Sequence, residues 1–247
     1  MEFKIVSWNL NYWQNKKYKT EVDFLEWKKS IYEKIKTFNA NIVLLQEINI
    51  NCFDNIEENI YYHELPNLDW GSAILSKKYN IIKHSFNSSY IGSQALMFYD
   101  FIIDTNTKIS IINIYGKGDY HEKNVYYNTT LHHMISDIGP FVHRNNKNII
   151  ILAGDFNATM QQELADTAKY MDDKPLFDRI NDFGLINCME KLQQTHINKQ
   201  NPDKPWHLDY IFINKKYFSK KRETNIYNQP EFKKLSDHYP CEIILEI

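Results

Sequence analysis

The chain has 247 residues, of which 43% are hydrophobic and 24% charged, and its formal net charge is −2. These proportions exclude global disorder and supply enough apolar surface for a sizeable core, so we expect one domain spanning residues 1–247. No window approaches the roughly 18 uncharged apolar residues of a membrane span, which predicts a cytoplasmic protein without a membrane partner. The three cysteines are odd in number and far apart, which argues against disulfides and a thiolate metal site. We expect a monomer.

Polar side chains end the first two predicted strands. Residues 3–11 have the pattern of a central strand, with Asn9 near its end. Residues 21–38 carry apolar side chains every three or four positions, the period of an amphipathic helix. Residues 42–47 form a second buried strand that ends on Glu47. A carboxylate at the end of a mostly apolar strand is costly to bury unless it meets a cation, so Glu47 is a candidate functional residue.

Short strands separated by turn signals fill the middle of the chain. We expect them at residues 61–65, 71–76, 81–86, 95–103 and 109–115, with a hairpin turn at residues 104–107. The last of these strands ends in Tyr115, which places a phenol beside a glycine-containing loop. An apolar stripe predicts a second long helix near residues 125–142.

Residues 149–158 contain an apolar run that stops at a glycine followed by Asp155 and Asn157. Such a run predicts a strand buried on both faces. The two polar residues alternate, so both side chains point to one side at the rim of the sheet. An ordinary turn after a strand has the same composition, because Asp, Asn and Gly are turn formers.

The last third of the chain supplies further strand-end polar groups. We expect a short helix at residues 175–183, closed by Gly184, and strands at residues 185–188, 206–213 and 241–247. Asp209 lies in the second of these strands, and Asp237 and His238 precede the last. Two blocks of strands, each with a long helix, predict an α/β (α+β) sandwich of two mainly antiparallel sheets flanked by helices.

The polar groups at these strand ends have the types needed for hydrolysis of a phosphoester, which suggests one shared pocket. A hard divalent cation prefers oxygen ligands, so we predict a Mg²⁺ site, with Mn²⁺ as an alternative, at Glu47 with Asn9 or Asp237. We expect Asp155 to deprotonate the attacking water and Asn157 to hold the nucleophile or a phosphoryl oxygen.

The remaining predicted catalytic residues are hydrogen-bond donors and their partners. His238 would donate to a non-bridging phosphoryl oxygen, while Asp209 fixes the tautomer of His238 and keeps it cationic. Tyr115 would donate to the phosphate.

Two clusters combine cations with aromatic residues. Lys16, Lys17 and Lys19 are flanked by Tyr12, Trp13 and Tyr18, and residues 203–234 carry eight Lys and Arg against four Asp and Glu, a local charge of +4. Such surfaces can track a nucleic-acid backbone and stack on its bases. Solvated loops also carry lysine runs.

The ordered set of motifs resembles the endonuclease/exonuclease/phosphatase superfamily. The matching stretches are Ser7-Trp8-Asn9, Leu45-Gln46-Glu47, residues 71–76, Asn113-Ile114-Tyr115, Gly154-Asp155-Phe156-Asn157, Leu208-Asp209-Tyr210 and Ser236-Asp237-His238. The resemblance implies a two-sheet α/β sandwich and Mg²⁺-dependent phosphoester hydrolysis. It also implies Glu47 as metal ligand, Asp155 as the residue that activates water, and Asp209 and His238 as a pair.

Tyr115 and Trp206 look like the branch that contains exonuclease III, abasic-site endonucleases and retrotransposon endonucleases. In that branch a Pro-Asn pair usually follows the tyrosine, whereas residues 116–119 here are Gly-Lys-Gly-Asp, so an asparagine that grips phosphate is missing or is supplied by Asn124. His207 stands where an arginine is common. We therefore expect Trp206, Lys117, Asn124 and Trp13 to bind substrate, and we leave abasic-site specificity open.

Three functions follow from these observations. The first is a metal-dependent nuclease that acts on nucleic acid, DNA rather than RNA. The second is a phosphatase or phosphodiesterase that acts on RNA, a nucleotide or another small phosphorylated molecule. The third, a protein that only binds nucleic acid, is disfavoured because binding needs neither a water-activating acid nor a histidine–carboxylate pair.

Overall fold

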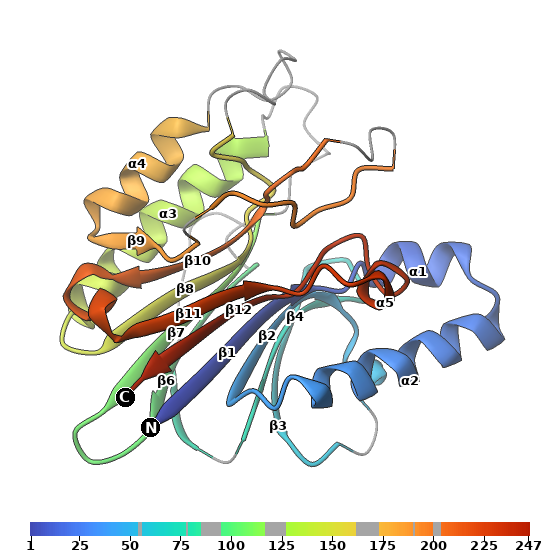
Figure 1. Ribbon diagram of the computed structural model, residues 1–247, viewed down its shortest axis with the longest axis horizontal. Helices are drawn as coiled ribbons and strands as arrows, with labels where there is room; N and C mark the ends of the chain where they lie inside the picture. Colours follow the sequence, from blue (N-terminus) through green and yellow to red (C-terminus); the bar gives the residue numbers. More distant parts are fainter. Residues whose placement is uncertain are drawn as a thin grey trace.

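A computed structural model describes residues 1–53, 56–77, 79–84, 95–116, 127–161, 173–189, 191–199 and 204–247. Two six-stranded sheets pack face to face, and helices cover their outer faces (Figure 1). The predicted sandwich is therefore confirmed. No helix in these ranges is both long and apolar enough to cross a bilayer.

The first sheet has the strand order β11-β12-β1-β2-β4-β3. Only β1 and β2 run parallel; the other neighbours are antiparallel. The strands are β1 (Glu2–Asn9), β2 (Ile42–Ile48), β3 (Asn59–Glu64), β4 (Gly71–Ser76), β11 (Lys221–Ile226) and β12 (Cys241–Glu246).

The second sheet has the order β5-β6-β7-β8-β10-β9, and here only β7 and β8 run parallel. Its strands are β5 (Asn80–Lys83), β6 (Leu96–Ile102), β7 (Lys108–Tyr115), β8 (Ile149–Asp155), β9 (Leu185–Asn187) and β10 (Asp209–Asn214).

Amphipathic helices form the outer layers. The apolar stripe of α2 packs on the first sheet, and Thr20 caps this helix by accepting a hydrogen bond from Asp23 N. In the same way, α3 and α4 cover the second sheet (Figure 1). The helices are α1 (Tyr12–Tyr18), α2 (Glu21–Thr37), α3 (Tyr127–Arg144), α4 (Lys174–Asp182) and α5 (Pro230–Lys233), with short 3₁₀ turns η1 (Ile50–Cys52) and η4 (Lys215–Lys220).

Some element boundaries differ from the sequence predictions. The strand expected from Trp206 begins at Asp209, because Trp206 pairs with His196 in an isolated bridge instead. The sequence patterns missed α1, which lacks a long apolar stripe, and β11, a charged edge strand. Charges are common on edge strands because they discourage pairing with another chain.

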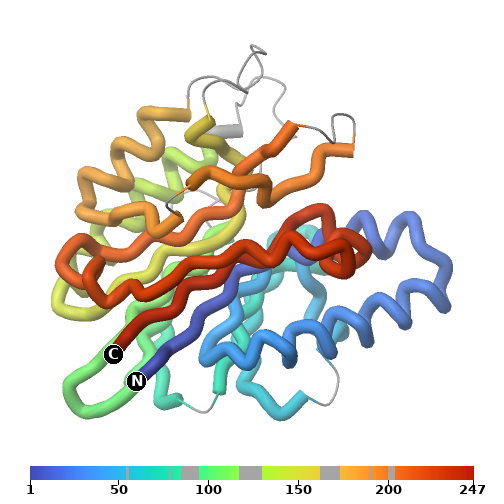
Figure 2. The backbone as a smooth tube through the Cα atoms, in the orientation of Figure 1, coloured from blue at the N-terminus to red at the C-terminus, as the bar shows by residue number. Residues whose placement is uncertain are grey.

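Strand direction gathers the candidate site at one end of the sandwich. The carboxyl ends of β1, β2, β7 and β8 and the amino ends of β10 and β12 meet there. The chain termini lie side by side at the other end, where Ile247 N donates to Met1 O at 2.9 Å (Figure 2).

Candidate active site

Side chains alternate between the two faces of a strand, and this alternation places polar side chains at one end of the layer between the sheets. In β8, Ile149, Ile151 and Ala153 pack in the intersheet core, and Asp155 follows at the next position of the same face. Asp155 pairs in register with Tyr115 of β7 on one side and with Asp209 of β10 on the other. Three predicted site residues therefore lie abreast on the second sheet.

Asn9 joins the two sheets. It ends β1, and its Nδ2 donates to Asp155 Oδ2 at 2.8 Å and to Glu47 Oε1 at 3.0 Å. Its Oδ1 accepts a hydrogen bond from Asn11 N at 2.8 Å. The carboxamide thus holds the two carboxylates at fixed positions, and Oδ1 keeps one lone pair for a further contact.

Glu47 reaches this cluster because β2 is irregular. Simple alternation would place Glu47 on the helix-facing side with Val43 and Leu45, away from Asn9. The pairing of β2 with β4 shifts register between Leu45 and Ile48, and Glu47 has a left-handed backbone with φ 49°. Such bulges redirect side chains near functional sites.

A glycine and a turn fix Asp155 and Asn157. A Cβ on Gly154, whose φ is 150°, would lie 1.9 Å from Ile114 O, so only glycine lets β7 and β8 approach. Asn157 has φ 48°, and its backbone N and Nδ2 donate to Asp155 at 2.8 and 3.2 Å. Asp155 is fully buried and accepts hydrogen bonds at both carboxylate oxygens.

Asp209 and His238 form a buried pair. His238 Nδ1 lies 2.9 Å from Asp209 Oδ2, and His238 Nε2 lies 3.8 Å from Asp155 Oδ2. Ser236 Oγ accepts from His238 N at 3.0 Å and donates to Asn9 O at 2.7 Å. The hydrogen bond at Nδ1 leaves Nε2 directed at the neighbourhood of Asp155.

Thr195 supports this pair. No sequence pattern indicated this residue, because it lies in an irregular polar stretch. Its Oγ1 accepts from Leu208 N at 2.9 Å and from Asp209 N at 3.1 Å. Its backbone O accepts from Tyr239 N at 2.7 Å. Thr195 therefore ties the segments that carry Asp209 and His238 to each other.

In a comparison with protein families, the model of the Endonuclease/Exonuclease/phosphatase family matches residues 6–238. The chain belongs to this family. Members are divalent-metal-dependent phosphoester hydrolases. A comparison with curated protein sequences finds no match.

Solved structures share the fold of this endonuclease/exonuclease/phosphatase chain at low sequence identity. An AP endonuclease from Archaeoglobus fulgidus is 14% identical, with a TM-score of 0.70 over 99% of this chain and 100% of that one. Truncated Caenorhabditis elegans TDP2 is 15% identical, with a TM-score of 0.71 over 100% and 98%. The Neisseria 3′ phosphatase NExo (D146N), bound to a product DNA hairpin, is 13% identical, with a TM-score of 0.68 over 99% and 100%.

Burial and neighbouring charges shift the pKa values in the site of this family member. Burial raises the pKa of Asp155 to about 7, against the lowering effect of His238. Burial also raises the pKa of Glu47, although hydrogen bonds from Asn9 and Tyr115 oppose it. Burial alone would lower the pKa of His238, but the carboxylates of Asp209 and Asp155 raise it well above its usual value. The two carboxylates therefore favour the cationic form of the histidine.

Unpartnered carboxylate oxygens fit a divalent cation. Among the described residues, Glu47 Oε2, Asp209 Oδ1 and Asp237 Oδ1 are buried without a hydrogen-bond partner. Leaving such oxygens bare is costly, and carboxylate oxygens are the ligands that Mg²⁺ prefers. Ligand atoms of Asp155, Asp209 and His238 also lie within 4.8 Å of one another. The residues present therefore fit a metal.

The predicted substrate-binding residues are spread more widely. Trp206 is only 6% exposed and pairs with His196, and Trp13 on α1 is 40% exposed. Lys117 and Asn124 lie outside the described residues.

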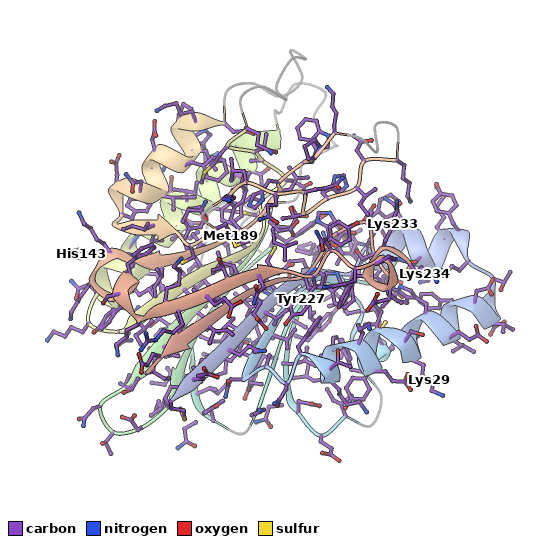
Figure 3. All side chains as sticks on the ribbon, in the orientation of Figure 1. Lys29, His143, Met189, Tyr227, Lys233 and Lys234 are labelled. Carbon is purple, nitrogen blue, oxygen red and sulfur yellow. The ribbon has the colours of Figure 1, made fainter. Side chains whose placement is uncertain are left out.

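A groove of about 350 Å³ begins at Asn11, Ser236 and Asp237 beside the candidate site. It runs between α1 and α5, and both predicted basic clusters contribute to its walls; Figure 3 shows Lys233 and Lys234 near α1. Trp13 is not among its lining residues. The cations that line it are Lys19, Lys199, Lys233 and Lys234.

Proposed function

We propose that the protein is a metal-dependent nuclease that hydrolyses phosphodiester bonds of DNA by in-line attack of water. The observation that carries the proposal is the convergence of Glu47, Asp155 and the Asp209–His238 pair at one end of the intersheet layer. This set combines a base, a cationic hydrogen-bond donor and bare carboxylate oxygens, which phosphoester hydrolysis requires.

Glu47 and Asp237 would hold the metal through their unpartnered oxygens, and Asn9 Oδ1, which accepts one hydrogen bond from Asn11 N, would supply a third oxygen. When bound, Mg²⁺ or Mn²⁺ supplies charge neutralisation at the phosphoryl group and the leaving oxygen.

Asp155 would accept the proton of the attacking water. A pKa of about 7 suits a base that works near neutral pH, and Asn9 and Asn157 hold its carboxylate in place. His238 Nε2 would donate to a non-bridging phosphoryl oxygen, while Asp209 orients the ring through Nδ1. Tyr115 and Asn157 would donate to the remaining phosphoryl oxygens.

The basic groove supports a polymeric substrate. Among the described residues, no carboxylate forms an ion pair with Lys19, Lys199, Lys233 or Lys234, so their charge is available to phosphates that flank the scissile bond. Tyr18 at the groove is 70% exposed and offers a stacking face. DNA is favoured over RNA because an AP endonuclease and a DNA-bound 3′ phosphatase share the fold.

The groove volume of about 350 Å³ also suits a small ligand, which favours a phosphatase or phosphodiesterase acting on a nucleotide or on RNA as the second candidate. The deciding experiment compares hydrolysis of single- and double-stranded DNA, an abasic duplex, single-stranded RNA and a phosphomonoester. Each substrate is tested with Mg²⁺ and with EDTA, beside Asp155→Asn. We expect Mg²⁺-dependent cleavage of DNA that Asp155→Asn abolishes; cleavage of the monoester alone would overturn the nuclease proposal.

Two double variants that each remove two lysine charges test whether DNA binds along the groove. Lys233→Ala with Lys234→Ala should weaken DNA binding and flatten its salt dependence by about one unit of slope per lysine. The matched control is Lys28→Ala with Lys29→Ala on α2. Neither residue lines the groove, and Figure 3 shows Lys29 apart from Lys233 and Lys234. Equal salt slopes in the two double variants would show that DNA does not follow the groove.

A further inference from the structure

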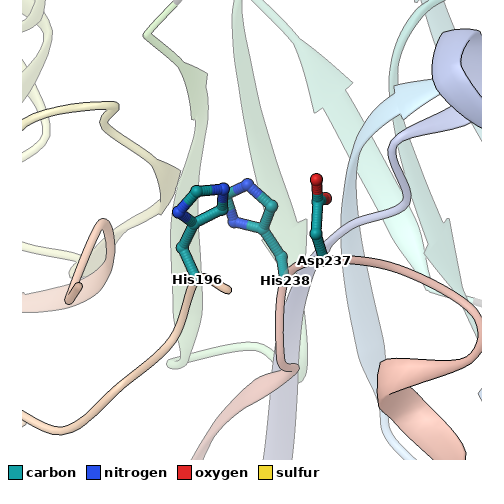
Figure 4. A group of neighbouring side chains, drawn as sticks. All are labelled: His196, Asp237 and His238. Carbon is teal, nitrogen blue, oxygen red and sulfur yellow. The ribbon is translucent and has the colours of Figure 1, made fainter. Parts of the chain in front are cut away.

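His196 lies against the catalytic histidine and has no assigned role. Two backbone hydrogen bonds tie its segment to that of His238: Tyr239 N donates to Thr195 O, and Ile197 N donates to Asp237 O, each at 2.7 Å. The ring centroids of His196 and His238 are 4.6 Å apart, and Figure 4 shows the two rings against each other with the carboxylate of Asp237 beside them. Backbone pairing on both sides thus fixes the three side chains relative to one another.

These three side chains offer metal-ligating atoms close to one another, and two of these atoms have no hydrogen-bond partner among the described residues. One ligand atom from each of His196, Asp237 and His238 lies within 4.8 Å of the others. Among the described residues, His196 Nδ1 and Asp237 Oδ1 are buried and accept or donate no hydrogen bond. Small rotations of these side chains would bring the atoms onto one ion, since bonds to zinc are about 2.0–2.2 Å long.

Asp209 orients His238 for metal binding. Its carboxylate holds Nδ1 at 2.9 Å, which leaves Nε2, 3.8 Å from Asp155 Oδ2, as the nitrogen that would bind zinc on releasing its proton. A carboxylate that accepts from the far nitrogen of a ligating histidine fixes the ring and makes it a better ligand, and this arrangement recurs around protein-bound zinc.

We propose that His196, Asp237 and His238 form a binding site for Zn²⁺. Two imidazoles and one carboxylate match the preference of Zn²⁺ for nitrogen and oxygen donors. Mg²⁺ prefers oxygen ligands and should therefore bind these three side chains more weakly than Zn²⁺ does. The site shares Asp237 with the proposed Mg²⁺ ligands, and it occupies His238 Nε2. Bound Zn²⁺ therefore inhibits hydrolysis; this consequence, unlike the binding itself, rests on the proposed function.

Zinc binding is tested directly on the full-length protein by calorimetric titration with Zn²⁺ in excess Mg²⁺. We expect one Zn²⁺ per chain, and we expect His196→Gln to weaken the affinity at least tenfold. The matched control is His143→Gln: this exposed histidine lies in the last turn of α3, on the far side of the molecule (Figure 3), and its loss should leave the affinity unchanged. Equal Zn²⁺ affinity in the wild type and His196→Gln would overturn the site.

Co²⁺ gives a second readout that needs no variant. Co²⁺ in a four-coordinate site absorbs visible light far more strongly than hydrated Co²⁺, so the wild-type protein should develop such a band and lose it on addition of Zn²⁺. A spectrum that stays that of the hydrated ion overturns the proposal even if His196→Gln fails to fold. In hydrolysis assays with Mg²⁺, His196→Gln should need at least tenfold more Zn²⁺ than the wild type for half-inhibition; equal sensitivity would overturn the inhibitory role.

Discussion

Glu47 and Glu242 are both buried glutamates of the first sheet, yet their surroundings differ. Glu242 forms an ion pair with Lys4 at 2.9 Å and accepts from Asn225 at 3.0 Å and from Tyr227 at 2.6 Å, so both of its oxygens have partners. Glu47 accepts from Asn9 at 3.0 Å but leaves Oε2 without a partner among the described residues. A buried acid whose oxygens are all satisfied stabilises the fold, whereas one with a bare oxygen indicates a ligand site.

Substitution of the two glutamates should differ most in its effect on the rate of hydrolysis. We expect Glu47→Gln to lower Mg²⁺-dependent hydrolysis by about 10²–10³-fold, because the metal loses a charged ligand that is worth several kcal/mol of charge stabilisation. Glu242→Gln should stay within a few-fold of wild type, because Glu242 lies outside the cluster. Initial rates over a range of Mg²⁺ concentrations measure both; a Glu47→Gln rate close to that of the wild type would remove Glu47 from the metal site.

The effects on the free energy of unfolding should have the opposite order, with the larger loss in the Glu242 variant. Glu242→Gln should lower the free energy of unfolding by about 1–3 kcal/mol, because it leaves Lys4 unpaired and sets an amide against groups that donate to Glu242. Glu47→Gln should be neutral or stabilising in EDTA, since a neutral amide is less costly to bury than a carboxylate. Urea unfolding in EDTA measures both values. A larger loss in Glu47→Gln than in Glu242→Gln would contradict the comparison.

The stability of the metal-free protein should also depend on pH. The folded-state pKa of Asp155, about 7, lies above the unfolded value of about 3.9, so the folded chain binds more protons between these limits and loses stability as pH rises through them. The raised pKa of His238 acts in the same direction at higher pH, because that stabilisation is lost as the histidine deprotonates.

In EDTA we therefore expect the melting temperature to fall by about 2–4 °C for each kcal/mol lost between pH 5 and pH 8. Mg²⁺ should reduce this fall, because it binds the deprotonated carboxylates. Melting curves with and without Mg²⁺ test the prediction. A melting temperature that rises with pH in EDTA would contradict the assigned direction, and Asp155→Asn should flatten the slope.

Much of the fold and several site positions could be predicted from the sequence, because the alternation of apolar and polar residues and the apolar runs depend only on neighbouring residues. Asp155 follows an apolar run with the spacing that places it between the sheets, and Asn9 ends β1 by the same rule. Asp209 was expected inside a strand that starts at residue 206, whereas it begins β10. Glu47 was predicted as a buried acid, but its contact with Asn9 depends on a bulge that no local pattern indicates. Lys117 and Asn124 stay predictions, since they lie outside the described residues.

The sequence by itself determined which segments become strands and helices, and which polar side chains end them, because period and composition depend on near neighbours. Only the tertiary structure decided that Asn9 bridges the sheets, that the two basic clusters line one groove, and that the ring of His196 lies against that of His238. Residues 196 and 238 are far apart along the chain, and their approach depends on how β10 and β12 pair within different sheets. Long-range pairing of this kind leaves no periodic signal in either segment.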